Sequence, residues 1–60
     1  MTHEHFTEAL EDELRRRRVH FRQAELTSFV AAHWASIVKN PDVQRWASEF
    51  IDSGHGTVSV

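Results

Sequence analysis

Five arginines stand within a stretch of eight positions: Arg15, Arg16, Arg17, Arg18 and Arg22. A guanidinium group donates paired hydrogen bonds to a phosphate, so this cluster is a candidate contact for a nucleic-acid backbone, with Phe21 as a stacking surface. Acids precede the cluster, however, and Glu11, Asp12 and Glu13 each stand four positions before an arginine. This order favours ion pairs along a helix. The spacing therefore favours a solvated, internally paired surface, and phosphate or acidic-partner binding is the alternative.

Five histidines raise the question of a metal site. Imidazoles on a helix share a metal ion when they stand three or four positions apart, but His3 and His5 are two apart and His20 and His33 are thirteen apart. We therefore predict neither a metal site nor a cofactor, apart from copper or nickel chelation by His3 and a free amino terminus if Met1 is retained. His33 is expected in the core, hydrogen-bonded to a neighbour.

The other polar residues form no catalytic motif. The serines stand in neither a nucleophile elbow nor a glycine-rich phosphate loop, and cysteine is absent from the sequence. A small helical domain also has little room for a pocket that excludes water. We predict a protein without enzymatic activity and without a small-molecule substrate.

The chain has 60 residues and a formal net charge of -2, which limits it to one small domain without a general attraction to nucleic acid or anionic lipid. Its longest apolar stretch, residues 29–38, is interrupted by His33 and Ser36 and is too short to span a bilayer. Glu4 and Glu8 argue against a signal peptide. A cytoplasmic location is the expectation.

Apolar residues at helical spacing predict three helices, over about residues 3–18, 24–39 and 41–52, followed by a tail over 53–60. The third helix should start at Asn40-Pro41-Asp42, with Asn40 as its cap and Pro41 in the first turn. The second helix should form an antiparallel hairpin with the third around a core of large aromatic side chains. These are Phe29, Trp34, Trp46 and Phe50.

The apolar stripes of the first and second helices point in nearly opposite directions if the chain is drawn as one helix. The chain therefore either breaks near residues 19–22 or continues as one long helix that needs a partner. The candidate interaction face consists of Phe6, Leu10, Leu14 and Phe21. These side chains either close a three-helix monomer or meet a second copy in a dimer.

Two short segments, residues 19–21 and 57–60, alternate as strands do. They could pair with one another, but the second segment is expected to be a frayed end. A helix-turn-helix arrangement fits poorly, because Asp42, Glu49 and Asp52 would face the phosphates.

The sequence thus predicts an all-α, three-helix domain. Its predicted function is a non-catalytic protein-interaction module that associates with a second copy or another protein. The alternative is a small nucleic-acid-binding regulator that uses the arginine cluster.

Overall fold

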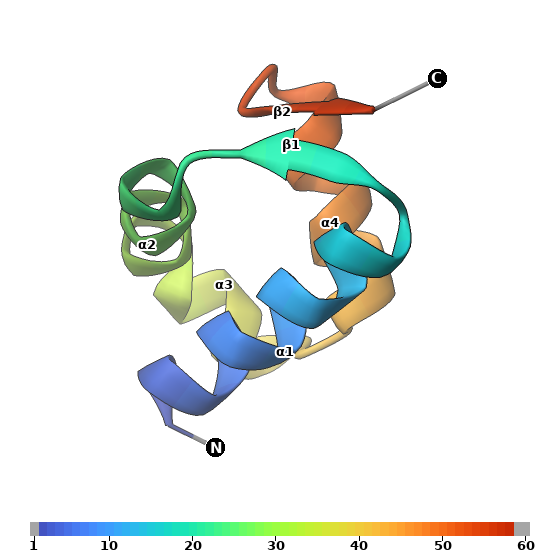
Figure 1. Ribbon diagram of the computed structural model, residues 1–60. Helices are drawn as coiled ribbons and strands as arrows, with labels where there is room; N and C mark the ends of the chain where they lie inside the picture. Colours follow the sequence, from blue (N-terminus) through green and yellow to red (C-terminus); the bar gives the residue numbers. More distant parts are fainter. Residues whose placement is uncertain (1, 59–60) are drawn as a thin grey trace.

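A computed structural model describes residues 2–58 of the chain (Figure 1). The elements follow in the order α1 (His3–Arg16), β1 (Val19–Phe21), α2 (Gln23–Ala32), α3 (Trp34–Lys39), α4 (Val43–Asp52) and β2 (Gly56–Val58). The predicted helical character is confirmed. The predicted three-helix, all-α architecture is not, because the described part of the chain has four helices and a two-stranded sheet.

Helix α1 is closed at both ends by local hydrogen bonds. The Thr2 hydroxyl accepts from the His5 amide at 3.1 Å, as a helix N-cap does. At the other end the chain leaves the helix at Arg18, whose φ of 60° is left-handed and whose amide donates to the Arg15 carbonyl at 3.0 Å. Of the two possibilities that the opposed apolar stripes left open, a break or one long helix, the structure has the break. It falls closer to α1 than expected, and no single long helix forms.

The predicted second helix, residues 24–39, is divided at His33. The backbone of His33 has φ -107° and ψ 12°, which ends α2 and begins α3. The turn brings Trp34 against α1, where its ring lies 5.1 Å from that of His3 and 6.3 Å from that of Phe6. Apolar residues continue at helical spacing through this turn, so the periodicity alone predicted one helix.

Helix α4 begins two residues later than predicted. Its N-cap is Asp42, whose carboxylate accepts from the Arg45 amide at 3.3 Å, so Pro41 precedes the helix. Asn40 ends α3 instead of starting α4. Its carbonyl accepts from the indole Nε1 of Trp46 at 2.8 Å, which connects the two helices.

The C-terminal end of α4 turns the chain back towards the core. The Gly54 amide donates to the Ile51 carbonyl at 3.0 Å, and the His55 amide donates to the Phe50 carbonyl at 3.3 Å. These are the two hydrogen bonds of a Schellman motif, and Gly54 supplies its left-handed residue with φ 85°. The His55 ring then stacks on Phe50 with 5.5 Å between centroids.

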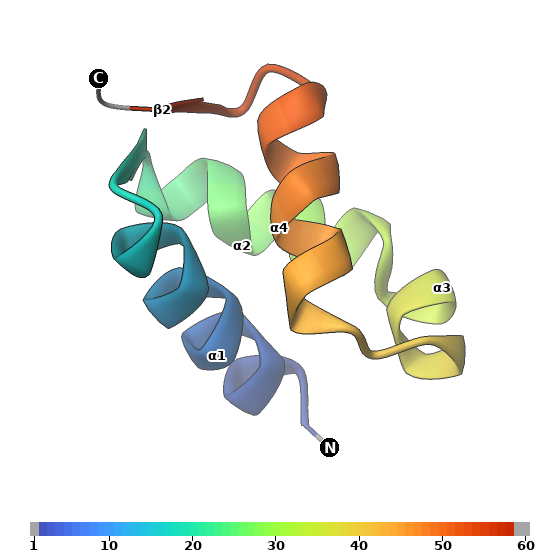
Figure 2. The ribbon, with the colours of Figure 1, turned by 90° about the vertical axis from the view of Figure 1, so that its right-hand side faces the viewer.

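The segment after this turn forms β2, which pairs with β1 in antiparallel register. Val19 lies opposite Val58, and Phe21 lies opposite Gly56. The expectation of a frayed end over residues 57–60 was therefore wrong for residues 57–58, whereas residues 59–60 lie outside the described part. The sheet lies at the opposite end of the molecule from the N-terminus (Figures 1 and 2).

One apolar core joins all the elements except β2. Its buried residues are Phe6, Leu10, Leu14, Val19, Leu26, Phe29, Val30, Ile37, Ala47 and Phe50. The most extensive helix packing is between α1 and α4 rather than in the predicted hairpin. Helix α2 meets α4 mainly through Phe29, whose ring lies 5.2 Å from that of Phe50 and 6.2 Å from that of Trp46. Both tryptophans are only partly buried, at the edge of this core.

The candidate interaction face predicted from the sequence lies inside the molecule. Phe6, Leu10 and Leu14 are 0% exposed within a single chain. Phe21 is half-buried and meets Phe50 edge to face at 6.2 Å. These side chains therefore pack within the single chain, and this face is not left open for a second copy.

No helix in the described part of the chain is both long enough and apolar enough to cross a membrane.

Candidate interaction surface

The structure pairs three residues of the arginine cluster with acids on α1. Arg15 lies 2.5 Å from Glu11, and both Arg16 and Arg17 pair with Glu13, at 3.4 Å and 2.7 Å. Two of the three predicted pairs form, but Arg16 pairs with Glu13 instead of Asp12. The charge of this cluster is therefore partly compensated within the helix.

Arg17 also connects α1 to α4. Its guanidinium donates to the Ser48 hydroxyl and to the Gln44 carbonyl, both at 3.1 Å. Its side chain is 31% exposed, against 65% for Arg15 and 76% for Arg16. With the bond from Nε to Glu13, these contacts occupy three of the five N–H donors of Arg17 and give it a structural role.

Arg18 and Arg22 are exposed and form no ion pair with a described residue. They lie on either side of β1, and Arg22 lines a surface depression together with His20, His55 and Thr57. Glu25 lines the same depression, which lowers its positive charge. The five arginines therefore have different surroundings, since three pair with acids of α1 and Arg18 and Arg22 do not.

A different surface is hollowed and mostly apolar. A groove of about 340 Å³ runs along α2, and we call it the α2 groove. Its lining residues are Ala24, Glu25, Ser28, Phe29, Ala32, His33 and His55. All but His55 lie on α2 or at its C-cap. They form two adjacent rows with a spacing of four positions, residues 24, 28 and 32 and residues 25, 29 and 33, which places them on one side of the helix.

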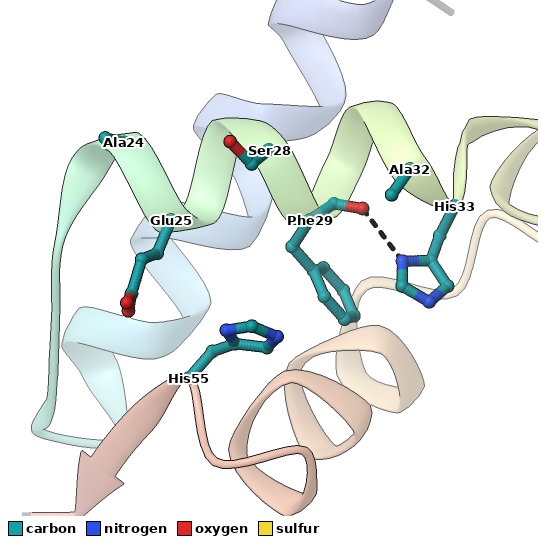
Figure 3. A pocket seen from close by; sticks show the side chains of 7 residues that line it. All are labelled: Ala24, Glu25, Ser28, Phe29, Ala32, His33 and His55. Atoms are coloured by element: carbon teal, nitrogen blue, oxygen red, sulfur yellow. Dashed lines mark hydrogen bonds between the residues drawn. The ribbon is translucent and has the colours of Figure 1, made fainter.

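Figure 3 shows how the groove is built. The Phe29 ring forms its floor and is only 4% exposed. His33 and His55 lie against this ring, with centroids 4.3 Å and 5.7 Å away. Ala24, Ser28 and Ala32 form the helix side, where their small side chains leave the backbone accessible. Glu25 and His33 lie at opposite ends.

The hydrogen bond of His33 defines the chemistry of its ring. Nδ1 lies 2.9 Å from the Phe29 carbonyl, and since a carbonyl only accepts, Nδ1 carries the proton. Nε2 has no hydrogen-bond partner among residues 2–58. His33 was predicted to be hydrogen-bonded to a neighbour, and it is, but it is exposed at the edge of the core rather than buried.

The groove lies in a surface that carries little charge. Among residues 23–38, Glu25 is the only aspartate, glutamate, lysine or arginine, although most of these positions are exposed. The exposed positions of α1, in contrast, include Glu4, Glu8, Asp12 and Arg16. Charged side chains keep a surface hydrated, and protein interfaces are depleted in them. The exposed surface of α1 is therefore charged, whereas that of α2 and α3 up to residue 38 is almost uncharged.

Comparison with protein families, with curated proteins and with solved structures finds no match to this chain. Functional inference therefore rests on the chemistry of this surface. No cluster of three or more metal-binding side chains occurs among residues 2–58.

Sequence reasoning missed the α2 groove, although part of its signal was present. A run of sixteen residues with a single carboxylate and no lysine or arginine, in which four alanines occupy exposed positions, is unusual for a helix at a protein surface. His55 gave no such signal, because only the turn after α4 brings it to Phe29.

Proposed function

We propose that this chain is a non-catalytic protein-interaction module and that the α2 groove is its contact surface. The observation that carries the proposal is the combination of a hollow of about 340 Å³ with an almost uncharged helix surface around it. Burying such a surface removes few charges from water, so apolar contact is opposed by little desolvation.

The shape of the groove favours a helical partner. Ala24, Ser28 and Ala32 repeat every four residues and leave a shallow channel parallel to the α2 axis. Ridges on one helix pack into channels of this kind on another helix. His33 Nε2 and the Glu25 carboxylate supply polar contacts at the two ends, which fix the partner's position along the groove.

The nucleic-acid alternative has less support. The paired arginines Arg15, Arg16 and Arg17 would have to break ion pairs to reach phosphates, and Glu25 lies beside Arg22. We therefore place the binding function on α2 and not on the arginine cluster.

A site-specific photo-crosslinker tests the proposal. A benzophenone amino acid placed at Ser28 in the groove should give covalent protein adducts in the cells that produce the chain. The same group at Glu49, which is exposed on α4, is the control. Adducts at position 28 that disappear on adding Ala32→Arg would support the proposal. Equal yields at positions 28 and 49 would refute it.

A further inference from the structure

We infer that the occupant of the α2 groove is a second copy of this chain, with the two α2 helices antiparallel and Glu25 of each copy paired with His33 of the other. This inference rests on the proposed function and adds the identity and orientation of the partner. Its basis is that one groove carries an acid at one end and an imidazole at the other.

The two polar ends are available to an external partner. Glu25 is exposed and makes no ion pair or side-chain hydrogen bond with residues 2–58. His33 uses Nδ1 for the Phe29 carbonyl and leaves Nε2 for another contact. When protonated, the imidazole donates from Nε2 as well, and a carboxylate is the acceptor that suits it best.

Antiparallel pairing gives a partner to both polar ends of each groove at once. Glu25 and His33 are eight positions apart, or about 12 Å along the helix. A two-fold axis between two antiparallel α2 helices reverses the second groove, so each carboxylate meets an imidazole. A parallel arrangement would instead place Glu25 against Glu25 and His33 against His33. The charge pattern therefore selects the antiparallel arrangement. In it both copies use the same residues, so the contact is isologous.

The small side chains in the middle of the groove allow the two α2 helices to approach each other. Ser28 lies near the midpoint between Glu25 and His33, so the two-fold axis passes close to it. Ala24 and Ala32 lie one turn to either side and keep the backbones unobstructed. The Phe29 ring, which is the floor of each groove, is then covered by the second helix. Because α2 has only 10 residues, the contact is small and the dimer is weak and reversible.

A disulfide trap tests the geometry directly, since the native chain has no cysteine. Ser28→Cys places a thiol beside the axis. Thr27→Cys is the matched control, because Thr27 is exposed on the same helix but faces the α1 side. Under mild oxidation we expect a covalent dimer from Ser28→Cys about tenfold faster than from Thr27→Cys, because a disulfide needs Cβ atoms about 4 Å apart. Equal rates would overturn the inference.

Charge complementation tests the contact between positions 25 and 33. The loss from Glu25→Lys alone tests the orientation, because in a parallel pair this change only replaces one contact between like charges by another. Glu25→Lys puts a cation against each imidazole, and His33→Glu puts two carboxylates together. We expect each variant alone to lose about tenfold in dimer affinity. An equimolar mixture should recover it as a heterodimer, because the ammonium introduced at position 25 then meets the carboxylate introduced at position 33, while the unchanged histidine meets the unchanged acid. Sedimentation equilibrium measures all three samples.

The outcomes separate this inference from the proposed function. A mixture no tighter than either variant alone, or a wild-type chain that stays monomeric at millimolar concentration, would overturn the inference. If crosslinks from position 28 then lead to a different protein, the interaction function stands and only the identity of the partner was wrong. Circular dichroism checks that His33→Glu still folds, and the disulfide trap decides alone if it does not.

Discussion

At the scale of single residues, neighbours in one sequence cluster have unlike roles. Arg15 and Arg16 lie mostly in water, where an ion pair contributes little to stability. Arg17 reaches across to α4 and satisfies two oxygens there. Arg18 has a left-handed backbone that ends α1. A run of identical residues therefore contains a surface charge pair, a tertiary contact and a helix terminator.

The contacts of Arg17 predict a measurable contribution to stability. We expect Arg17→Ala to lower the free energy of unfolding by about 1–2 kcal/mol, because three hydrogen bonds are lost at a partly exposed site. Arg15→Ala, which removes only an exposed ion pair, should cost less than about 0.5 kcal/mol. Urea denaturation measures both variants. Equal losses would show that the contact with α4 is not stabilising.

The left-handed backbone of Arg18 predicts that a substitution by glycine there does not lower stability, in contrast to Arg17→Ala. A non-glycine residue at φ 60° is strained, and glycine adopts this conformation readily. We expect Arg18→Gly to leave stability unchanged or to raise it by up to about 1 kcal/mol, since relief of strain outweighs the added freedom of the unfolded chain. Arg16→Gly, inside α1, should lower it by about 1 kcal/mol. A loss at Arg18 as large as that at Arg16, measured by urea denaturation, would contradict the left-handed assignment.

At the scale of elements, the ends of helices decide the fold more than their middles do. The break at His33 brings Trp34 to α1, and the Schellman turn at Gly54 brings His55 and β2 to Phe50. The α2 groove depends on both turns, because one supplies His33 and the other supplies His55.

The two glycines after α4 have different roles, which substitution can separate. A Cβ at Gly56 would lie 2.7 Å from Val19 Cγ1 and 3.1 Å from Phe50 Cε2, so Gly56→Ala requires core atoms to move. We expect it to cost about 1–3 kcal/mol. Gly54 has open space around it but φ 85°, so Gly54→Ala should cost about 1 kcal/mol through backbone strain alone.

A third substitution distinguishes the two causes. Asparagine tolerates left-handed backbone better than alanine does, so Gly54→Asn should recover part of the loss. Asparagine at position 56 should be at least as harmful as alanine, because it adds atoms to a contact that is already too close. Thermal unfolding of the four variants provides the comparison. Rescue by asparagine at position 56 would rule out steric conflict there.

At the scale of the whole molecule, one chain closes its own core. Its radius of gyration is 10.4 Å, about the value expected for a compact chain of this length. It exposes 4153 Å², near the roughly 4,000 Å² expected for a folded monomer of this mass. No buried side-chain nitrogen or oxygen among residues 2–58 lacks a hydrogen-bond partner. Self-association is therefore not needed to complete the core, and the dimer that we propose uses a surface that the single chain already has.

This closure predicts that folding does not depend on association. We expect Ser28→Arg, which blocks the α2 groove, to stay within about 0.5 kcal/mol of the wild type in stability, because position 28 is exposed. Its melting temperature should not change with protein concentration. A dilution series followed by circular dichroism measures this. Unfolding of the variant on dilution would show that the second copy is part of the fold.

Local patterns in the sequence determined the helical class and two of the α1 ion pairs, and they left a break near residues 19–22 as one of two possibilities. Each depends on residues at most four positions apart or on the phase of an apolar stripe, and both can be read along the chain without knowing its fold. The strand-like alternation of residues 19–21 and 57–58 is also visible in the sequence, but the sequence left open whether the two segments pair.

Only the tertiary structure decided which surfaces are buried and which face water. Phe6, Leu10 and Leu14 look the same in sequence whether α4 or a second chain covers them, and α4 covers them. His33 and His55 are twenty-two positions apart and come together only because both turns direct them to Phe29. Burial depends on what packs against a face, and that is settled by contacts between distant segments rather than by spacing along the chain.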